Sequence, residues 1–229
     1  MALQQRDFVL DGDNFTHHYL CNYKPYFEGV DRLSYSLIRF KKSETIDVRA
    51  WTDCSVEALK RIHFRTSTAV LRSLHSSEEK VGAGLTSPLD ILGLAIASAI
   101  DGQYLPHLLR KNKVIPPLKG LKLEAREKLM KNLYDFEKEG TINSILIVDD
   151  IFTSGTTMAA IIRAIRKRLS CPISLFTLAA TDQASNKERT LSGVGYSWKP
   201  EQGWIQVQEP DEPYYRVADL KKLIEEDFQ

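Results

Sequence analysis

Two adjacent carboxylates are the residues whose type and position most clearly suggest chemistry. Asp149 and Asp150 close a run of four aliphatic residues in the stretch ILIVDDIFTSGTT, residues 145–157. Neighbouring carboxylates repel each other, so they need compensating partners or ligands. Ionised carboxylates accept hydrogen bonds from hydroxyl groups, and they also hold magnesium ions.

The residues that follow the two aspartates are suited to binding an anion. Four hydroxyl side chains and one glycine precede or open an expected helix: Thr153, Ser154, Gly155, Thr156 and Thr157. The first amide groups of a helix attract anions, and a glycine lets the backbone come close to a ligand. An anion receptor beside paired hydroxyl acceptors is what a ribose 5-phosphate would need.

Other classes of protein contain sequence patterns similar to this aliphatic run followed by Asp-Asp. An aliphatic run ending in Asp-Asp could be the second motif of a P-loop NTPase, but the chain has no GxxxxGK[ST] sequence. It could also be the acidic pocket of a phospho-receiver domain, but that pocket lies on the first strand, and here well over half of the chain precedes it. The non-functional alternative is a solvated strand end followed by a helix cap.

The elements needed to position these residues alternate between strand and helix over residues 81–180. Unbroken aliphatic runs indicate strands of a parallel sheet that is covered on both faces. The alternation predicts an α/β fold with a doubly wound, mostly parallel sheet. The expected order is strand 81–88, apolar helix 89–100, strand 104–112, amphipathic helix 121–139, strand 142–150, helix 156–169 and strand 171–180.

The two ends of the chain differ from this pattern. Residues 33–40 and 45–51 look like short strands, and Asp53 is expected to cap a helix that carries Leu59, Ile62, Val70 and Leu74. The tail is rich in aromatic residues and prolines, which suggests a cap over the core. We therefore expect three parts: an N-terminal extension at 1–50, an α/β core at 51–190 and a C-terminal cap at 191–229.

Composition excludes several classes of function. The formal net charge is +1 over 229 residues, so nucleic acid is not an expected partner. The longest apolar run, residues 91–100, is too short to span a membrane, and the first residues show no secretory signal. Three distant cysteines without a CxxC pair predict a reducing, cytoplasmic location. The histidines lack metal-binding spacing, so no protein-built metal site is expected.

The stretch 145–157 resembles the thirteen-residue phosphoribosyl pyrophosphate (PRPP) motif of type I phosphoribosyltransferases, and it matches every position. The resemblance implies that Asp149 and Asp150 bind the ribose 2′ and 3′ hydroxyls and serve catalysis. It also implies that residues 153–157 wrap the 5′-phosphate, and that Mg²⁺ arrives with PRPP. The implied partners are PRPP and a small-molecule acceptor, without a membrane, and a homodimer is one option. In that family a cap called the hood, here formed by the termini, covers the acceptor base.

A second likeness extends over residues 80–180. It resembles the ComF-like branch of the family, which is associated with competence and DNA uptake, through Leu121, Arg126, Asn132 and Phe136. The chain lacks the cysteine-rich segment of that branch. Its loop TSPLDILG also has no basic residue, so Thr86 and Ser87 are the candidates for a pyrophosphate loop.

The remaining candidates come from the family analogy. The basic segment RKNKVIPPLKGLK would form a mobile lid through Lys111 and Lys113, or else a solvated connection. Trp198 is the candidate for stacking on the acceptor base, with Tyr196 and Trp204 as alternatives. Two functions are consistent with these residues: a Mg²⁺-dependent transferase that acts on a nitrogenous base, and a non-catalytic PRPP or nucleotide sensor.

Overall fold

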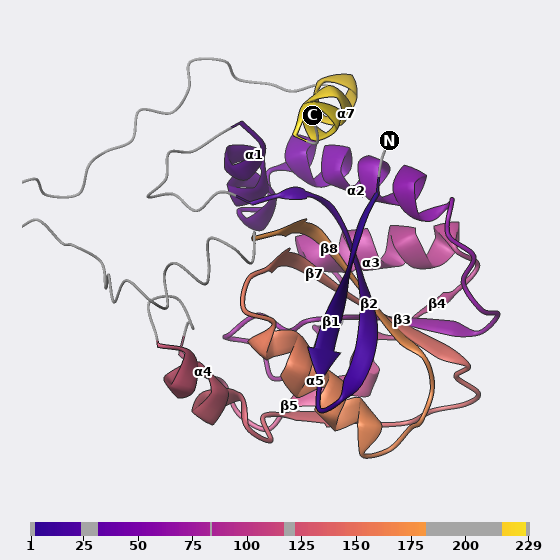
Figure 1. The fold of residues 1–229 in the computed structure, drawn as a ribbon, viewed down its shortest axis with the longest axis vertical. Coiled ribbons are helices and arrows are strands. Elements are labelled where there is room, and N and C mark those ends of the chain that lie inside the picture. The colour runs from indigo at the N-terminus through magenta and orange to yellow at the C-terminus, as the bar shows by residue number, and fades with distance from the viewer. Residues whose placement is uncertain (1–2, 24–31, 83, 117–121, 182–216, 228–229) are drawn as a thin grey trace, which may run out of the picture.

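A six-stranded sheet forms the centre of the molecule (Figure 1). The computed structural model describes residues 3–23, 32–82, 84–116, 122–181 and 217–227. The strand order is β1–β2–β8–β7–β3–β4, and every neighbouring pair is parallel except β1 and β2. The strands are β1 (Gln4–Leu10), β2 (Asp13–Asn22), β3 (Thr68–Arg72), β4 (Gln103–Tyr104), β7 (Ser144–Phe152) and β8 (Ile173–Ala180).

Helices cover both faces of this sheet, which confirms the expected doubly wound α/β fold. Figure 1 shows one group of helices on one face and α5 with α4 on the other. The first group is α1 (Arg32–Lys41), α2 (Thr45–Leu59), α3 (Pro88–Ala99) and α7 (Val217–Glu226). On the second face lie α4 (Leu123–Met130), α5 (Thr156–Arg166) and a hairpin made of β5 (Leu109–Lys111) and β6 (Tyr134–Phe136).

The aliphatic run before the two aspartates is buried on both sides. Ile145 and Ile147 belong to the core under α5, whereas Leu146 and Val148 belong to the core under α1, α2 and α3. Successive side chains of a strand point to opposite faces, so both layers require apolar residues from β7. This requirement explains why the run shows no polar alternation.

The order of the strands reverses direction between β3 and β7. From β3 the chain passes through α3 to β4 on one side, and it later returns to place β7 on the other side of β3. Such a reversal leaves a crevice beyond the carboxyl ends of the two strands, where open α/β sheets bind ligands. The fold therefore sets a candidate site at the ends of β3 and β7.

Several predicted elements in the first part of the chain were wrong. Residues 33–40 and 45–51 lie in helices α1 and α2, because Leu33, Leu37 and Phe40 are buried at helical spacing. The predicted helix from Asp53 ends at Leu59 in the structure. Val70, which was assigned to that helix, is instead fully buried in the short strand β3.

The middle of the chain also differs from expectation. The described residues of the predicted strand 81–88 form a turn that leads into α3. The predicted strand 104–112 divides into β4, a 3-10 turn at Pro106–Leu108 and β5, because Pro106 interrupts it. The predicted helix 121–139 ends at Met130, and Tyr134–Phe136 forms β6. The predicted elements at 89–100, 142–150, 156–169 and 171–180 are confirmed as α3, β7, α5 and β8.

The N-terminal segment is part of the main sheet. Strand β2 pairs in parallel with β8, so the hairpin β1–β2 completes one side of the sheet. Residue 50, the expected end of the N-terminal part, lies inside α2. The boundary near residue 190 falls outside the described residues, and the cap formed by the tail stays a prediction.

Candidate functional site

The two aspartates lie towards the carboxyl end of β7, beside the residue that follows β3. The Ser73 hydroxyl, directly after β3, donates a 2.6 Å hydrogen bond to Asp149 Oδ1, and the Asp150 backbone N–H donates to the same oxygen at 2.9 Å. The Ser73 backbone N–H also donates to the Val148 carbonyl. These bonds join the ends of the two strands at the point where the strand order reverses.

The second aspartate has a different partner. The Lys41 ammonium, at the end of α1, lies 3.2 Å from Asp150 Oδ1. Alternation along β7 explains the difference, because consecutive side chains point to opposite faces. Asp149 therefore contacts the loop after β3, and Asp150 contacts the helix layer on the other face.

The charges of these groups perturb one another. Burial, followed by the charge of Asp150, raises the pKa of Asp149 to about 7. Burial lowers the pKa of Lys41, but the carboxylates of Asp150 and Asp149 outweigh this effect, so its pKa is raised. A carboxyl group with a raised pKa beside a lysine is typical of a functional site, although structural ion pairs share the property.

The hydroxyl-rich loop leads directly into α5, as predicted. Gly155 precedes the helix with a φ of +73°, in the left-handed region that favours glycine. Ser154 and Thr156 share a 2.8 Å hydrogen bond, and among the described residues no side-chain hydrogen bond caps the start of α5. Thr153 and Ser154 are exposed, so hydroxyl and amide donors are available to an anion at this helix start.

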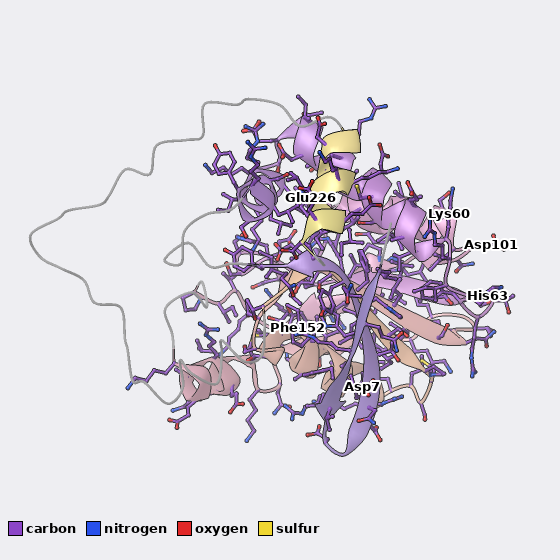
Figure 2. All side chains as sticks on the ribbon, turned by 45° about the horizontal axis from the view of Figure 1, so that its top comes forward. Asp7, Lys60, His63, Asp101, Phe152 and Glu226 are labelled. Carbon is purple, nitrogen blue, oxygen red and sulfur yellow. The ribbon has the colours of Figure 1, made fainter. Side chains whose placement is uncertain are left out.

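The N-terminal hairpin packs against this loop through Phe8 on β1. A Cβ on Gly155 would lie 2.7 Å from both the Phe8 and Phe152 rings, so Gly155 is required by space as well as by φ. The Phe8 and Phe152 rings pack edge to face at 5.3 Å, and Figure 2 places Phe152 near the middle of the molecule. Arg6 donates to the Thr181 carbonyl, and the Thr181 N–H donates to the Phe152 carbonyl.

The two residues predicted to form a pyrophosphate loop have different surroundings. The Ser87 side chain accepts from the Asp90 N–H, and Asp90 accepts from the Ser87 backbone in return, which forms a capping box for α3. Thr86 is exposed beside it. The segment directly after β3 is Ser73–Ser77 instead, because the preceding strand is 68–72 and not 81–88.

A buried ionic network supports that segment. The Arg72 guanidinium donates to Asp90 at 2.5 Å and to Glu78 at 2.8 Å, and the Tyr104 hydroxyl also donates to Asp90. Burial would lower the pKa of Arg72, but its bonds to Glu78 and Asp90 raise it above the ordinary value. The positive charge of Arg72 is thus already paired with the carboxylates of Asp90 and Glu78.

The expected lid residues are not equivalent. Lys111 lies in β5 and is only 5% exposed, and its ammonium donates to the carbonyl oxygens of Leu74 and His75. In this structure Lys111 is therefore not a solvated residue, and its lid role stays a prediction. Lys113 is exposed in the turn after β5.

Several other predicted residues fall elsewhere. Trp198, Tyr196 and Trp204 lie outside the described residues, as does Leu121. Phe136 is buried in the core of the β5–β6 hairpin, and Asn132 accepts from Lys167 away from the aspartates.

Sequence reasoning missed Ser73 and Lys41. Ser73 directly follows β3 and Lys41 is the last residue of α1, and the type of both elements was misassigned. The helical spacing of the apolar residues in α1 was the one signal that could have placed Lys41 at a helix end.

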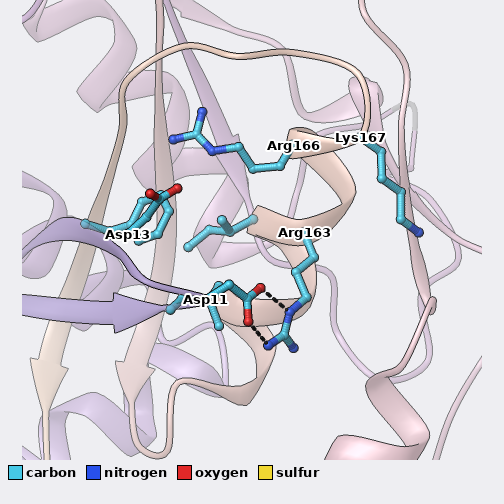
Figure 3. Close-up of a pocket in the computed structure, with 8 residues that line it drawn as sticks. Asp11, Asp13, Arg163, Arg166 and Lys167 are labelled. Carbon is cyan, nitrogen blue, oxygen red and sulfur yellow. Dashed lines mark hydrogen bonds and ion pairs between the residues drawn. The ribbon is translucent and has the colours of Figure 1, made fainter.

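A separate hollow of about 480 Å³ lies between the β1–β2 turn and the end of α5 (Figure 3). Arg163 forms a two-bond ion pair with Asp11 there, and Arg166 donates to the Cys171 carbonyl. These basic groups already have partners, and the carboxyl end of a helix disfavours anions. The hollow is therefore not the anion site.

Among the described residues, no three His, Cys, Asp or Glu side chains are placed to hold a metal ion together. Across the same part of the chain, no helix has both the length and the apolar character needed to cross a membrane.

Comparisons with known proteins gave similar folds only. No protein-family model and no curated protein matches the chain. A hypoxanthine phosphoribosyltransferase from Staphylococcus aureus matches at 14% identity and a TM-score of 0.33, over 58% of this chain and 62% of that one. An adenine phosphoribosyltransferase matches at 17% identity and a TM-score of 0.34, over 82% and 90%.

A third structure is adenine phosphoribosyltransferase from Saccharomyces cerevisiae, in complex with D-2,5-dideoxy-2,5-imino-altritol 1,6-bisphosphate and adenine. It matches at 16% identity and a TM-score of 0.33, over 94% of each chain. None of these three structures is a ComF-like protein. Because the identities and TM-scores are low, the functional proposal below rests on the site residues and not on these matches.

Proposed function

We propose that the protein binds PRPP and transfers its phosphoribosyl group to a small nitrogenous base, with release of pyrophosphate. The observation that carries this proposal is the Ser73–Asp149 hydrogen bond, which joins the ends of β3 and β7 where the strand order reverses. The hydroxyl-rich start of α5 follows the same strand. One edge of the sheet thus combines carboxylate acceptors with an anion-binding loop.

Each part of PRPP has a matching group in this arrangement. Asp149 and Asp150 accept hydrogen bonds from the ribose hydroxyls, and residues 153–157 donate to the 5′-phosphate. The segment Ser73–Ser77 lies beside Asp149 and takes the pyrophosphate. Trp198 remains our candidate for stacking on the base.

In the reaction, the bond from C1 to the pyrophosphate oxygen breaks, and the oxygen keeps the electron pair. The acceptor nitrogen supplies the pair for the new C1–N bond. Positioning of the two partners and exclusion of water are the main tasks of the protein, so no covalent nucleophile is needed.

Magnesium fits the site as a companion of the substrate. The described residues offer the Asp149 and Asp150 carboxylates at the end of β7, and the Lys41 ammonium already lies 3.2 Å from Asp150. A bound Mg²⁺ would neutralise charge on the pyrophosphate oxygens. Asp149 and Asp150 are the described residues that would hold Mg²⁺ together with the substrate.

Titration calorimetry with PRPP and Mg²⁺ tests the binding step. We expect Asp149→Asn and Asp150→Asn to weaken PRPP binding about tenfold or more, because each loses charge-assisted hydrogen bonds. Asp135→Asn, at an exposed position in β6, is the matched control and should bind as the wild type does. Equal affinity in all four proteins would contradict the proposal.

A PRPP sensor without catalysis is the second candidate. One observation favours it: the nearest cations to the segment after β3, Arg72 and Lys111, are both buried and already engaged. Pyrophosphate release with a panel of purine and pyrimidine bases separates the two functions. Binding without release on every base would favour the sensor.

A further inference from the structure

Strand β5 is hydrogen-bonded to the segment Ser73–Ser77 through Lys111. The Lys111 ammonium donates to the Leu74 carbonyl at 2.9 Å and to the His75 carbonyl at 2.6 Å. Two backbone bonds lie beside them: the Lys111 N–H donates to the carbonyl of Glu79, just after the segment, at 2.6 Å, and the N–H of Ile115, after β5, donates to the Ser76 carbonyl at 3.2 Å. Of the groups that make these four hydrogen bonds, the Lys111 ammonium alone is charged.

These bonds, together with the Glu78 N–H, which donates to the His75 carbonyl at 2.9 Å, fix the direction of the peptide groups beside the lysine. In a trans peptide the carbonyl and the following N–H point in opposite directions, and the structure has no cis peptide bond among its described residues. Because the His75 carbonyl points to Lys111, the Ser76 N–H points away from it. Within the described chain, no group accepts a hydrogen bond from that N–H.

The neighbouring donors are arranged around this free amide. The His75 N–H is taken by Glu78, which in turn accepts from Arg72. The His75 and Ser77 side chains are exposed and joined by a 2.7 Å hydrogen bond. Ser73, at the start of the segment, holds Asp149. The Ser76 N–H is thus three residues along the chain from Ser73, which is hydrogen-bonded to Asp149, the residue proposed to bind the ribose.

We propose that Lys111 is a positioning residue, which holds the segment Ser73–Ser77 so that the Ser76 N–H and the His75 and Ser77 side chains face the pyrophosphate of PRPP. This inference rests on the proposed function. It explains how a segment without an exposed Arg or Lys can bind an anion. The buried Lys111 orients the hydrogen-bond donors, and its positive charge also attracts the anion across the intervening backbone.

The test compares a ligand that carries pyrophosphate with one that lacks it. Calorimetry with Mg²⁺ measures PRPP and ribose 5-phosphate binding to the wild type, Lys111→Met and Lys111→Arg. Lys138→Met, at an exposed position just after β6, is the matched control. We expect Lys111→Met to weaken PRPP binding about tenfold or more, with ribose 5-phosphate within about twofold of the wild type. Lys111→Arg should recover part of the loss, and Lys138→Met should bind both ligands normally.

A merely structural lysine would give other results. Unchanged PRPP affinity in Lys111→Met, or an equal loss for both ligands, would overturn the proposal. If Lys111→Met does not fold, Lys111→Gln takes its place, because glutamine keeps a neutral donor. If the wild type binds neither ligand, the proposed function fails. Hydrogen exchange then decides the positioning role alone: faster exchange of the His75 and Ser77 amides in the variant supports it, and unchanged exchange refutes it.

Discussion

Asp149 has the most informative charge at the scale of single residues. Its pKa is raised to about 7 by burial and by Asp150, whereas an unfolded aspartate titrates near 4. Between these two pH values the folded protein binds the extra proton, so the contribution of Asp149 to stability is present below about pH 4 and lost as the pH rises through about 7.

This shift predicts a pH-dependent effect of Asp149→Asn. At pH 8 the variant removes a half-buried negative charge, and at pH 5 it replaces a carboxyl group that is already protonated. We expect the melting temperature of the variant, relative to the wild type, to rise by about 2 °C or more from pH 5 to pH 8. Thermal melts of the ligand-free proteins check this, and an identical difference at both pH values would count against the raised pKa.

Lys41 controls the same titration from the other face of the sheet. Its charge lowers the pKa of Asp149, although less than burial and Asp150 raise it. Lys41→Met should therefore move the titration midpoint of Asp149 further upward, as followed by carboxyl-carbon NMR. Lys42→Met, at the next and exposed residue, should leave the midpoint unchanged. A downward movement in Lys41→Met would contradict the ion pair.

At the scale of elements, the turn from β7 into α5 depends on Gly155. Gly140 provides a comparison, because it also has a positive φ, of +59°, but open space around the missing Cβ. Gly140→Ala should cost about 1 kcal/mol of unfolding free energy from its backbone alone. Gly155→Ala adds a clash with Phe8 and Phe152 and should cost about 2–4 kcal/mol.

Urea unfolding measures both glycine variants. Equal losses of unfolding free energy in the two variants would show that the Phe8 and Phe152 rings move aside easily. Packing would then not fix the conformation of the loop at 153–157. A larger loss for Gly155→Ala would show that the loop conformation depends on the aromatic contacts beneath it.

The strength of local signals decided which elements could be predicted from the sequence. Strand β7 and helix α5 have long, regular apolar patterns, so both elements, and the position of the aspartates towards the end of β7, were located correctly. Strand β3 is only five residues long, and burial on both faces removes its alternation. The error at β3 moved the expected pyrophosphate segment to Thr86 and Ser87, since the loop follows whichever strand is assigned.

Contacts between distant segments were beyond sequence reasoning. The pairing of Ser73 with Asp149, and of Lys41 with Asp150, is set by strand order and by helix packing, and neither is visible in residue spacing. The same holds for Lys111, whose basic neighbours suggested a solvated loop. Its burial follows from the β5–β6 hairpin, which a proline at 106 and an early end of α4 create.

At the scale of the whole molecule, the N-terminal hairpin and the hydroxyl-rich loop at 153–157 pack together despite their distance in the sequence. Phe8 on β1 packs on Phe152 and limits the space at Gly155. Phe8→Ala should lower the unfolding free energy by about 2–4 kcal/mol, because a half-buried ring leaves a cavity. It should also weaken PRPP binding several-fold, since the loop loses its support.

Val9→Ala is the matched control, because Val9 is the next residue on β1 and is 65% exposed. It should change neither stability nor affinity. Calorimetry and urea unfolding on the two variants separate the possibilities. If Phe8→Ala lost stability but kept full PRPP affinity, the hairpin would serve the sheet alone. A parallel loss would mean that the first strand of the chain is part of the machinery that holds the phosphate.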